Sequence, residues 1–206
     1  MKPPDDIKTI LVSRFSALGD VAMSVHVLQK LTAQNPHIQI VLLTRPFFAP
    51  LFHHIEGLTI HPVDLKGQHK GILGIRKLCK EIIASYNIDC YADIHAILRT
   101  QLIRFFLPSR IPRVHIDKGR AEKRALTRKR NKKRRPLKHS TERYADVFRK
   151  LGFTLDLTLP SEEKCYPVSK AISAIVALPS PKIGIAPFAK HKSKTYPVDR
   201  MRKVAS

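Results

Sequence analysis

The chain has 206 residues, 43% of them hydrophobic, which is enough to bury a core in one or two globular domains. No segment approaches the ~20 continuous apolar residues of a membrane helix, and the first residues do not form a secretory signal, so we expect a cytoplasmic chain. Lys and Arg number 38 against 16 Asp and Glu, and this net charge of +22 indicates an acidic partner: nucleic acid, an anionic membrane face or a phosphorylated substrate.

Cysteine and histidine spacing predicts no metal site. Cys79, Cys90 and Cys165 are odd in number and lack Cys-x-x-Cys spacing, so we expect reduced core thiols. The adjacent His53 and His54 would point about 100° apart on a helix and make poor joint ligands. Because the sequence also lacks Asp-x-Asp, it implies no bound divalent cation, and we expect no cofactor.

The first predicted unit is a strand followed by a turn and a helix. Residues 7–12 form a short apolar run, and from Val21 apolar residues recur at helical spacing. In open α/β sheets the turn between them is where ligands bind, because it lies beyond the carboxyl end of a strand and the helix offers unpaired N–H groups. Asp20 begins this helix. A carboxylate there also suits a helix cap, and position alone favours the cap.

Strands and helices continue to alternate after this unit. Apolar patterns predict strands at 39–44, 59–63, 89–95 and 113–116, and helices at 46–55, 72–82 and 98–107. The alternation predicts an α/β fold, a Rossmann-like parallel sheet with helices on both faces. The first turn holds only Gly19 in place of Gly-x-Gly-x-x-Gly, and no P-loop motif occurs, which excludes dinucleotide dehydrogenases and P-loop NTPases.

Residues 118–138 are strongly basic, with twelve Lys or Arg and Glu122 as the one acidic residue. Charges of one sign at this density repel each other in a regular helix, so we expect a mobile loop over 117–139. Helical order is expected to resume at 140–151, where Ser140 can cap the helix.

The domain organisation follows from the later part of the chain. A stretch with Pro160 and two glutamates predicts a linker at 155–167, after a first domain of residues 1–154. Residues 168–206 predict a helix at 168–178, a strand at 182–186, a polar loop and a helix from about Val198. One strand is too little for an independent α/β domain, so we expect the start of a truncated second domain.

Three stretches of the sequence match the motifs of one enzyme family. Arg14-Phe-Ser-Ala-Leu-Gly-Asp20 is similar to an Arg-x-Ser-Ser/Ala-Leu/Met-Gly-Asp opening, and residues 91–100 resemble an Asp-Leu-His-x-x-x-Arg-Ser strand and turn. Residues 182–197 resemble Val-Gly-Ile-x-Pro-Gly-Ala followed by Ser-Lys-Arg-Trp-Pro. The chain thus resembles glycosyltransferase family 9, the lipopolysaccharide heptosyltransferases. It departs from the family at Phe188, where Gly is usual, and at Tyr196, which replaces Trp.

The resemblance implies a GT-B fold, with acceptor on the N-terminal domain and ADP-sugar mostly on the C-terminal one. It implies transfer, with inversion, of a heptose or related sugar from ADP-heptose to the Kdo/lipid A inner core, at the inner face of the cytoplasmic membrane. Asp20 corresponds to the proposed catalytic base, and Ser193 and Lys194 are expected to meet the departing diphosphate. The family's later Asp-Thr/Ser-Gly-x-x-His donor motif does not occur in the 206 residues, so we expect no sugar transfer by this chain alone.

An anionic acceptor requires positive charge on the N-terminal domain. The expected acceptor-binding residues are Arg14, Ser16, Lys66, Lys70, Arg99 and Arg120. Each also has an ordinary interpretation as surface polarity or charge, and His95 is expected to be a hydrogen-bonded histidine near a strand end.

A second interpretation of the basic segment is a nucleic-acid arm on an α/β module without catalytic activity. Proteins that bind single strands stack bases on aromatic side chains, and none occurs between Lys118 and Lys138. This absence favours the transferase interpretation over nucleic acid.

Overall fold

The computed structural model describes residues 4–160, 169–177, 179, 181, 183–186, 188–189 and 192–205. The chain divides into two compact units, Met1–Ser161 and Glu162–Ser206. None of the helices in these described ranges is long and apolar enough to cross a membrane.

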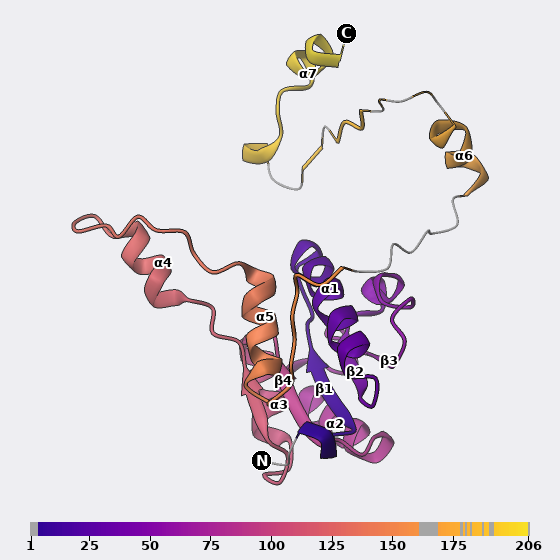
Figure 1. The fold of residues 1–206 in the computed structure, drawn as a ribbon, viewed down its shortest axis with the longest axis vertical. Coiled ribbons are helices and arrows are strands. Elements are labelled where there is room, and N and C mark those ends of the chain that lie inside the picture. Colours follow the sequence, from indigo (N-terminus) through magenta and orange to yellow (C-terminus); the bar gives the residue numbers. More distant parts are fainter. Residues whose placement is uncertain are drawn as a thin grey trace. The chain divides into compact units, whose positions relative to one another are not determined.

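The N-terminal unit is built on a five-stranded parallel sheet with the order β3-β2-β1-β4-β5 (Figure 1). The strands are β1 (Thr9–Ser13), β2 (Gln39–Thr44), β3 (Leu58–Pro62), β4 (Cys90–Asp93) and β5 (Arg113–His115). In the central strand, Ile10 lies opposite Ile40 of β2 and Cys90 of β4. The strand order reverses between β1 and β4, and such a switch point opens a crevice at the carboxyl ends of the two strands.

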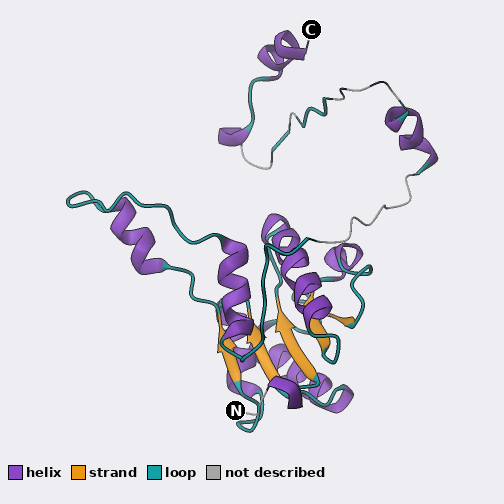
Figure 2. Cartoon of the chain, viewed as in Figure 1, coloured by secondary structure: helices purple, strands orange, loops and turns teal. Residues whose placement is uncertain are grey.

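Helices cover both faces of this sheet (Figure 2). The helical elements of the whole unit are η1 (Pro4–Asp6), α1 (Leu18–Gln34), η2 (Pro46–Leu51), α2 (Gly71–Ser85), α3 (Leu98–Phe106), α4 (Arg120–Thr127) and α5 (Ser140–Arg149). Successive residues of a strand face opposite sides, so Val12 packs under α1 and α5 while Leu11 packs under α2 and α3. The predicted Rossmann-like sheet with two helical layers is therefore confirmed.

The predicted elements up to residue 116 are present, with ends that differ by a few residues. The segment expected as a helix at 46–55 is a shorter 3-10 helix, η2. Pro46 and Pro50 lack the N–H groups that α-helical bonding would use, which limits the segment to tight turns. Cys79 and Cys90 are buried free thiols, and burial raises the pKa of both to about 12. Cys165 lies outside the described residues.

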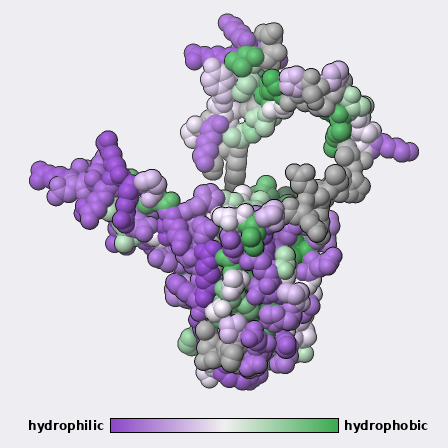
Figure 3. All heavy atoms as spheres, in the orientation of Figure 1, coloured by the Kyte–Doolittle hydropathy of each residue, from purple (hydrophilic) through white to green (hydrophobic). Residues whose placement is uncertain are grey.

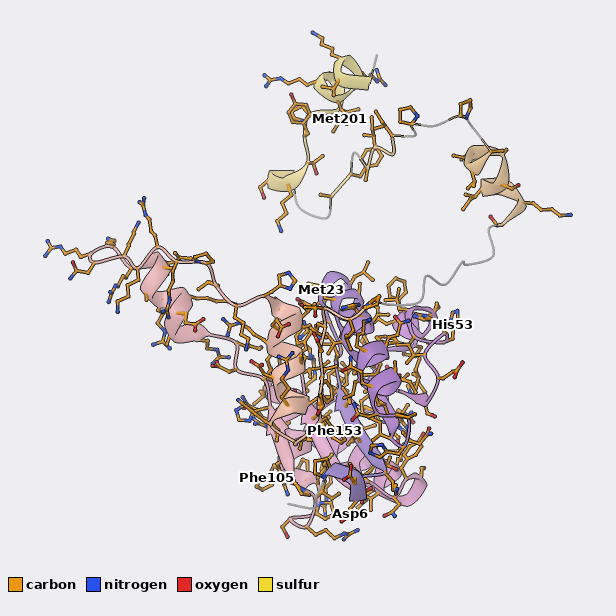
Figure 4. All side chains as sticks on the ribbon, in the orientation of Figure 1. Asp6, Met23, His53, Phe105, Phe153 and Met201 are labelled. Carbon is orange, nitrogen blue, oxygen red and sulfur yellow. The ribbon has the colours of Figure 1, made fainter. Side chains whose placement is uncertain are left out.

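The expectation of a loop throughout residues 117–139, hereafter the basic arm, is wrong. The arm contains α4, which begins after Gly119 in the left-handed conformation, with φ of 60°. Its cations do not prevent the helix, because Arg120, Lys123 and Arg124 are exposed to water that screens them. Figure 1 shows α4 standing away from the sheet, and Figure 3 shows the arm as a strongly hydrophilic projection. The expected cap of α5 is also wrong, since His139 rather than Ser140 accepts the N–H of Thr141.

The C-terminal unit contains α6 (Lys170–Val176), η3 (Lys192–Lys194) and α7 (Val198–Ala205). The strand expected at 182–186 does not form in its described part, residues 183–186, which are exposed and irregular. A strand is stabilised by a hydrogen-bonded neighbour, and none of the described residues of this unit supplies one. Of the helix expected at 168–178, the two end residues lie outside the described residues.

Candidate active site

The turn after β1 places a buried cation at the switch point of the sheet. The backbone N–H of Arg14 donates to the Leu43 carbonyl at 3.0 Å, and the Thr44 hydroxyl donates to the Arg14 carbonyl at 2.7 Å. These bonds fasten the turn to β2 and direct the Arg14 side chain across the end of β4, where it donates to the Ile94 carbonyl at 2.8 Å. Only 6% of the Arg14 side chain is exposed, so its charge needs a close partner.

Asp20 is that partner. It is the third residue of α1, and its Oδ2 lies 2.6 Å from a guanidinium nitrogen of Arg14. The N–H of Ala17, the N-cap residue, donates to the same oxygen at 3.4 Å. The carboxylate therefore combines a capping contact with an ion pair, and 42% of its side chain remains exposed. A carboxylate in this position is anchored and still within reach of a solute.

Tyr144 of α5 covers the other side of the pair. Its ring lies 5.3 Å from the Arg14 guanidinium carbon, a cation–π contact. Burial raises the pKa of the Tyr144 hydroxyl; the Arg14 charge opposes this shift, whereas the Asp20 charge and a hydrogen bond to Asp20 add to it. The hydroxyl thus stays protonated at neutral pH and can donate to Asp20.

His95, on the loop after β4, also faces Asp20 and Arg14. Its Nδ1 accepts the N–H of Phe15 at 3.4 Å, which leaves Nε2 to carry the proton toward the Ser16 hydroxyl, also at 3.4 Å. Burial, followed by the charges of Arg14 and Lys118, lowers the pKa of His95 to about 4, although Asp20 acts in the opposite direction. His95 is therefore neutral near neutral pH, and it is hydrogen-bonded near the end of a strand, as the sequence predicts.

Asp93, the last residue of β4, holds this loop in place. Its Oδ1 accepts the N–H groups of His95 at 2.9 Å and Ala96 at 2.7 Å. Ser13 donates to the same oxygen at 3.4 Å and bonds the hydroxyl of Tyr91 at 2.7 Å. Asp93 is fully buried, so it positions the β4 loop rather than meeting a ligand.

A cavity of about 390 Å³, the Asp20 cavity, opens at this point. Its lining includes three of the predicted site residues, which the turn and α1 bring together: Arg14, Ser16 and Asp20. His95 and residues from the basic arm and α5, among them Lys118, Lys123 and Tyr144, complete it. Apart from Asp20, the charged lining side chains are cationic, which suits an anionic solute that presents a hydroxyl to Asp20.

Two further cavities adjoin the Asp20 cavity. One, of about 430 Å³, contains the predicted Lys66 and Arg99 and shares Ser16 with the Asp20 cavity. The other, of about 680 Å³, contains the predicted Arg120 and shares Lys118 with it; we call it the Arg120 cavity. Lys70, the N-cap residue of α2, lines none of these three cavities.

Ser193 and Lys194 belong to the C-terminal unit, where both side chains are exposed on η3. Lys118 and Tyr144 were missed by sequence reasoning. Lys118 is one of many cations in its segment, and Tyr144 falls on the apolar stripe of α5, so no local signal distinguishes either residue. Among the described residues, no cluster of three or more His, Cys, Asp or Glu side chains is arranged to hold a metal ion.

Solved structures with the same arrangement of elements are glycosyltransferases. One is a glycosyltransferase of family 9 from Veillonella parvula, with a TM-score of 0.66 and 21% identity over 100% of this chain and 60% of that one. The chain has the fold of the corresponding part of this enzyme. The E. coli heptosyltransferase WaaC with ADP gives 0.61 and 18% identity over 96% of this chain and 63% of its own. WaaC with ADP-2-deoxy-2-fluoro heptose has a TM-score of 0.53 and 20% identity over 73% of this chain and 50% of its own.

The comparison agrees with the resemblance seen in the sequence motifs as far as the fold is concerned. The chain spans about 60% of the length of the Veillonella and ADP-bound WaaC structures. No protein-family model matches the sequence, and no curated protein does.

Proposed function

We propose that the chain is the acceptor-side part of a glycosyltransferase, with Asp20 as the base that takes the proton from the acceptor hydroxyl. The observation that carries this proposal is the half-exposed Asp20 carboxylate, held 2.6 Å from buried Arg14 in a cationic cavity at the switch point of the sheet. Its setting on the fold of a family 9 glycosyltransferase supports the choice of reaction.

The proposed step is a single displacement with inversion. The acceptor oxygen forms a bond to the anomeric carbon as the bond to the nucleoside diphosphate breaks, and the hydroxyl proton passes to Asp20. An aspartate carboxylate is a weak base compared with the alkoxide that full deprotonation of the acceptor would form. Weakness is tolerable here because the transition state of glycosyl transfer is oxocarbenium-like, and the hydroxyl becomes acidic as it bonds to that carbon. General-base assistance of this kind contributes roughly 10²–10⁴ in rate.

The proposed acceptor is an anionic glycolipid of the Kdo–lipid A type at the inner face of the cytoplasmic membrane. Acceptor binding is assigned to Arg14, Ser16, Lys66, Lys70, Arg99 and Arg120. The cavities that flank the Asp20 cavity support this, since Lys66 and Arg99 line one and Arg120 lines the other. The basic arm adds further cations, and each one near an anionic surface contributes about 1 kcal/mol.

The proposed donor is ADP-heptose or a related ADP-sugar, with Ser193 and Lys194 near its diphosphate. The solved structures of WaaC with ADP and with an ADP-heptose analogue support a nucleotide-sugar donor. A lysine ammonium and an exposed hydroxyl are suitable groups for a leaving diphosphate, on which negative charge grows as the glycosidic bond breaks.

The test is transfer from ADP-heptose to Kdo–lipid A, followed by mass spectrometry of the acceptor. It uses this chain and the chain fused to the donor-side half of WaaC, each with Asp20 and with Asp20→Asn. Heptosylated acceptor that forms with Asp20 and is lost with Asn supports the proposal. Unchanged product with Asn refutes the base assignment. No product from either form, together with binding of RNA in preference to Kdo–lipid A at matched salt, favours the nucleic-acid module.

A further inference from the structure

The Arg120 cavity lies beside β5, the edge strand of the sheet, between α3 and the base of the basic arm. Six of its lining residues are cationic: Arg104, Arg113, Lys118, Arg120, Arg124 and Lys150. Asp117 is the one carboxylate in the lining, and its Oδ1 accepts the N–H of Gly119 at 2.8 Å. The cavity therefore carries a large excess of positive charge.

Some neighbouring cations of the N-terminal unit are paired with carboxylates. Arg149 bonds Glu142 at 2.6 Å and Asp146 at 3.1 Å, and Arg143 bonds Glu122 at 2.6 Å. In the Arg120 cavity, five of the six cations form no ion pair with any described residue: Arg113, Lys118, Arg120, Arg124 and Lys150.

Glu122 is the acidic residue of α4, and it does not neutralise the cavity. Arg143 of α5 binds it at 2.6 Å, and Arg135 lies 4.0 Å from its other oxygen. Arg143 also donates to the carbonyls of Lys138 and Asp117, at 3.1 and 3.4 Å. The two ends of the basic arm are thus held to α5, and the α4 carboxylate is already engaged.

Three cationic side chains of the cavity wall show that its positive charge is not fully compensated by the protein. Burial, followed by the charges of Arg120 and Arg14, lowers the pKa of Lys118. The buried Nε of Arg104 has no hydrogen-bond partner, and it lies 3.8 Å from the Asp93 carboxylate. Arg113 is fixed by bonds to the carbonyls of Arg104, Leu107, Pro108 and Ile111. A fixed wall with crowded, unpaired cations is suited to an anion with several oxygens.

We propose that the Arg120 cavity is a binding site for a phosphate dianion, carried as the phosphomonoester group of a larger ligand. Guanidinium groups match phosphate oxygens with paired hydrogen bonds, and a phosphomonoester brings close to two negative charges at neutral pH. The volume of about 680 Å³ leaves room for the group that carries the phosphate. Lys118, which lines this cavity and the Asp20 cavity, places the phosphate beside the proposed reaction site. Phosphate binding does not depend on the transferase proposal.

The experiment compares two double variants that remove the same charge. Arg120→Gln with Arg124→Gln changes the cavity, whereas Arg130→Gln with Arg134→Gln changes exposed residues of the basic arm outside its lining. Each chain is titrated with inorganic phosphate by calorimetry at about pH 7.5, where phosphate is mostly the dianion, and chloride keeps the ionic strength constant. We expect the cavity variant to bind at least about tenfold more weakly, and the arm variant to remain within about twofold of wild type.

Two further ligands distinguish the source of the phosphate. Glucose 6-phosphate represents a soluble phosphomonoester, and phosphatidylcholine vesicles with phosphatidic acid represent a lipid one. Selective weakening of either ligand in the cavity variant supports the site and identifies that source. Equal weakening in the two double variants would show that the binding is a diffuse effect of net charge. That result, or unchanged phosphate binding in the cavity variant, overturns the proposal.

Discussion

Arg143 holds the basic arm to α5, and replacing it with methionine tests how the arm is positioned. Methionine keeps an unbranched apolar stem but cannot donate the three bonds of the guanidinium group. These bonds reach Glu122 at 2.6 Å and the carbonyls of Lys138 and Asp117 at 3.1 and 3.4 Å. The bond to Glu122 links α5 to α4, and the two carbonyl bonds hold the two ends of the arm.

The free energy that the arm loses in Arg143→Met can be estimated bond by bond. Glu122 is 37% exposed and rehydrates when its partner leaves, so its bond counts for about 1 kcal/mol. The two carbonyl bonds together add about 2 kcal/mol. The basic arm contributes no residue to the two hydrophobic clusters of the sheet, so this loss of about 3 kcal/mol should free the arm without opening the core.

Hydrogen exchange followed by mass spectrometry measures this effect directly. In Arg143→Met, we expect the amides of α4 to lose up to about a hundredfold of protection, while those of β1 and β4 keep theirs. Arg134→Met, which removes an exposed charge of the arm, is the control and should leave α4 unchanged. Equal protection of α4 in Arg143→Met and wild type would refute the clamp. A matching loss throughout the sheet would show that Arg143 instead supports the core.

Three further predictions concern the site and its supports. Asp20→Asn should lower turnover of the fused, active form by roughly 10²–10⁴ with its far-UV circular dichroism unchanged, and near wild-type kcat would restore the simple capping role. Gly119→Ala should destabilise the arm by about 1–3 kcal/mol in exchange measurements, since the residue has φ of 60° and a Cβ would lie 2.5 Å from the Arg143 guanidinium; protection equal to wild type would contradict this. His95 has a pKa of about 4 in the folded chain, below its usual 6.5. Between these two pH values the unfolded chain binds more protons than the folded chain, so the contribution of neutral His95 to stability is lost as the pH falls through that window. Urea unfolding measures the free energy of unfolding at about pH 7 and pH 5, and this free energy should fall less between the two pH values in His95→Asn than in wild type. An equal fall in the two chains would count against a buried neutral His95.

The strands and helices that depend on a local pattern of apolar residues were well predicted from the sequence. The strands of the sheet are short apolar runs, and α1 and α2 have apolar residues at helical spacing, so their positions follow from burial on one or both faces. The alternation of strands and helices also predicted that the turn holding Asp20 lies at the carboxyl edge of the sheet. The local pattern gave a wrong prediction where contacts between distant residues matter. The charge of the basic arm argued against a helix there, but α4 forms and Arg143 of α5 binds its Glu122.

The sequence by itself therefore determined the type of fold, the alternation of its elements and the turn that carries Arg14, Ser16 and Asp20. These features depend on the periodicity of neighbouring residues and on motifs contained in single stretches. Only the tertiary structure decided which distant side chains join them, because Tyr144 and Lys118 reach the Asp20 cavity from α5 and the basic arm through the packing of those segments. It likewise separated the cations into paired and unpaired groups. Pairing depends on distances of a few ångströms between residues far apart in the chain, and composition and periodicity contain no information about those distances.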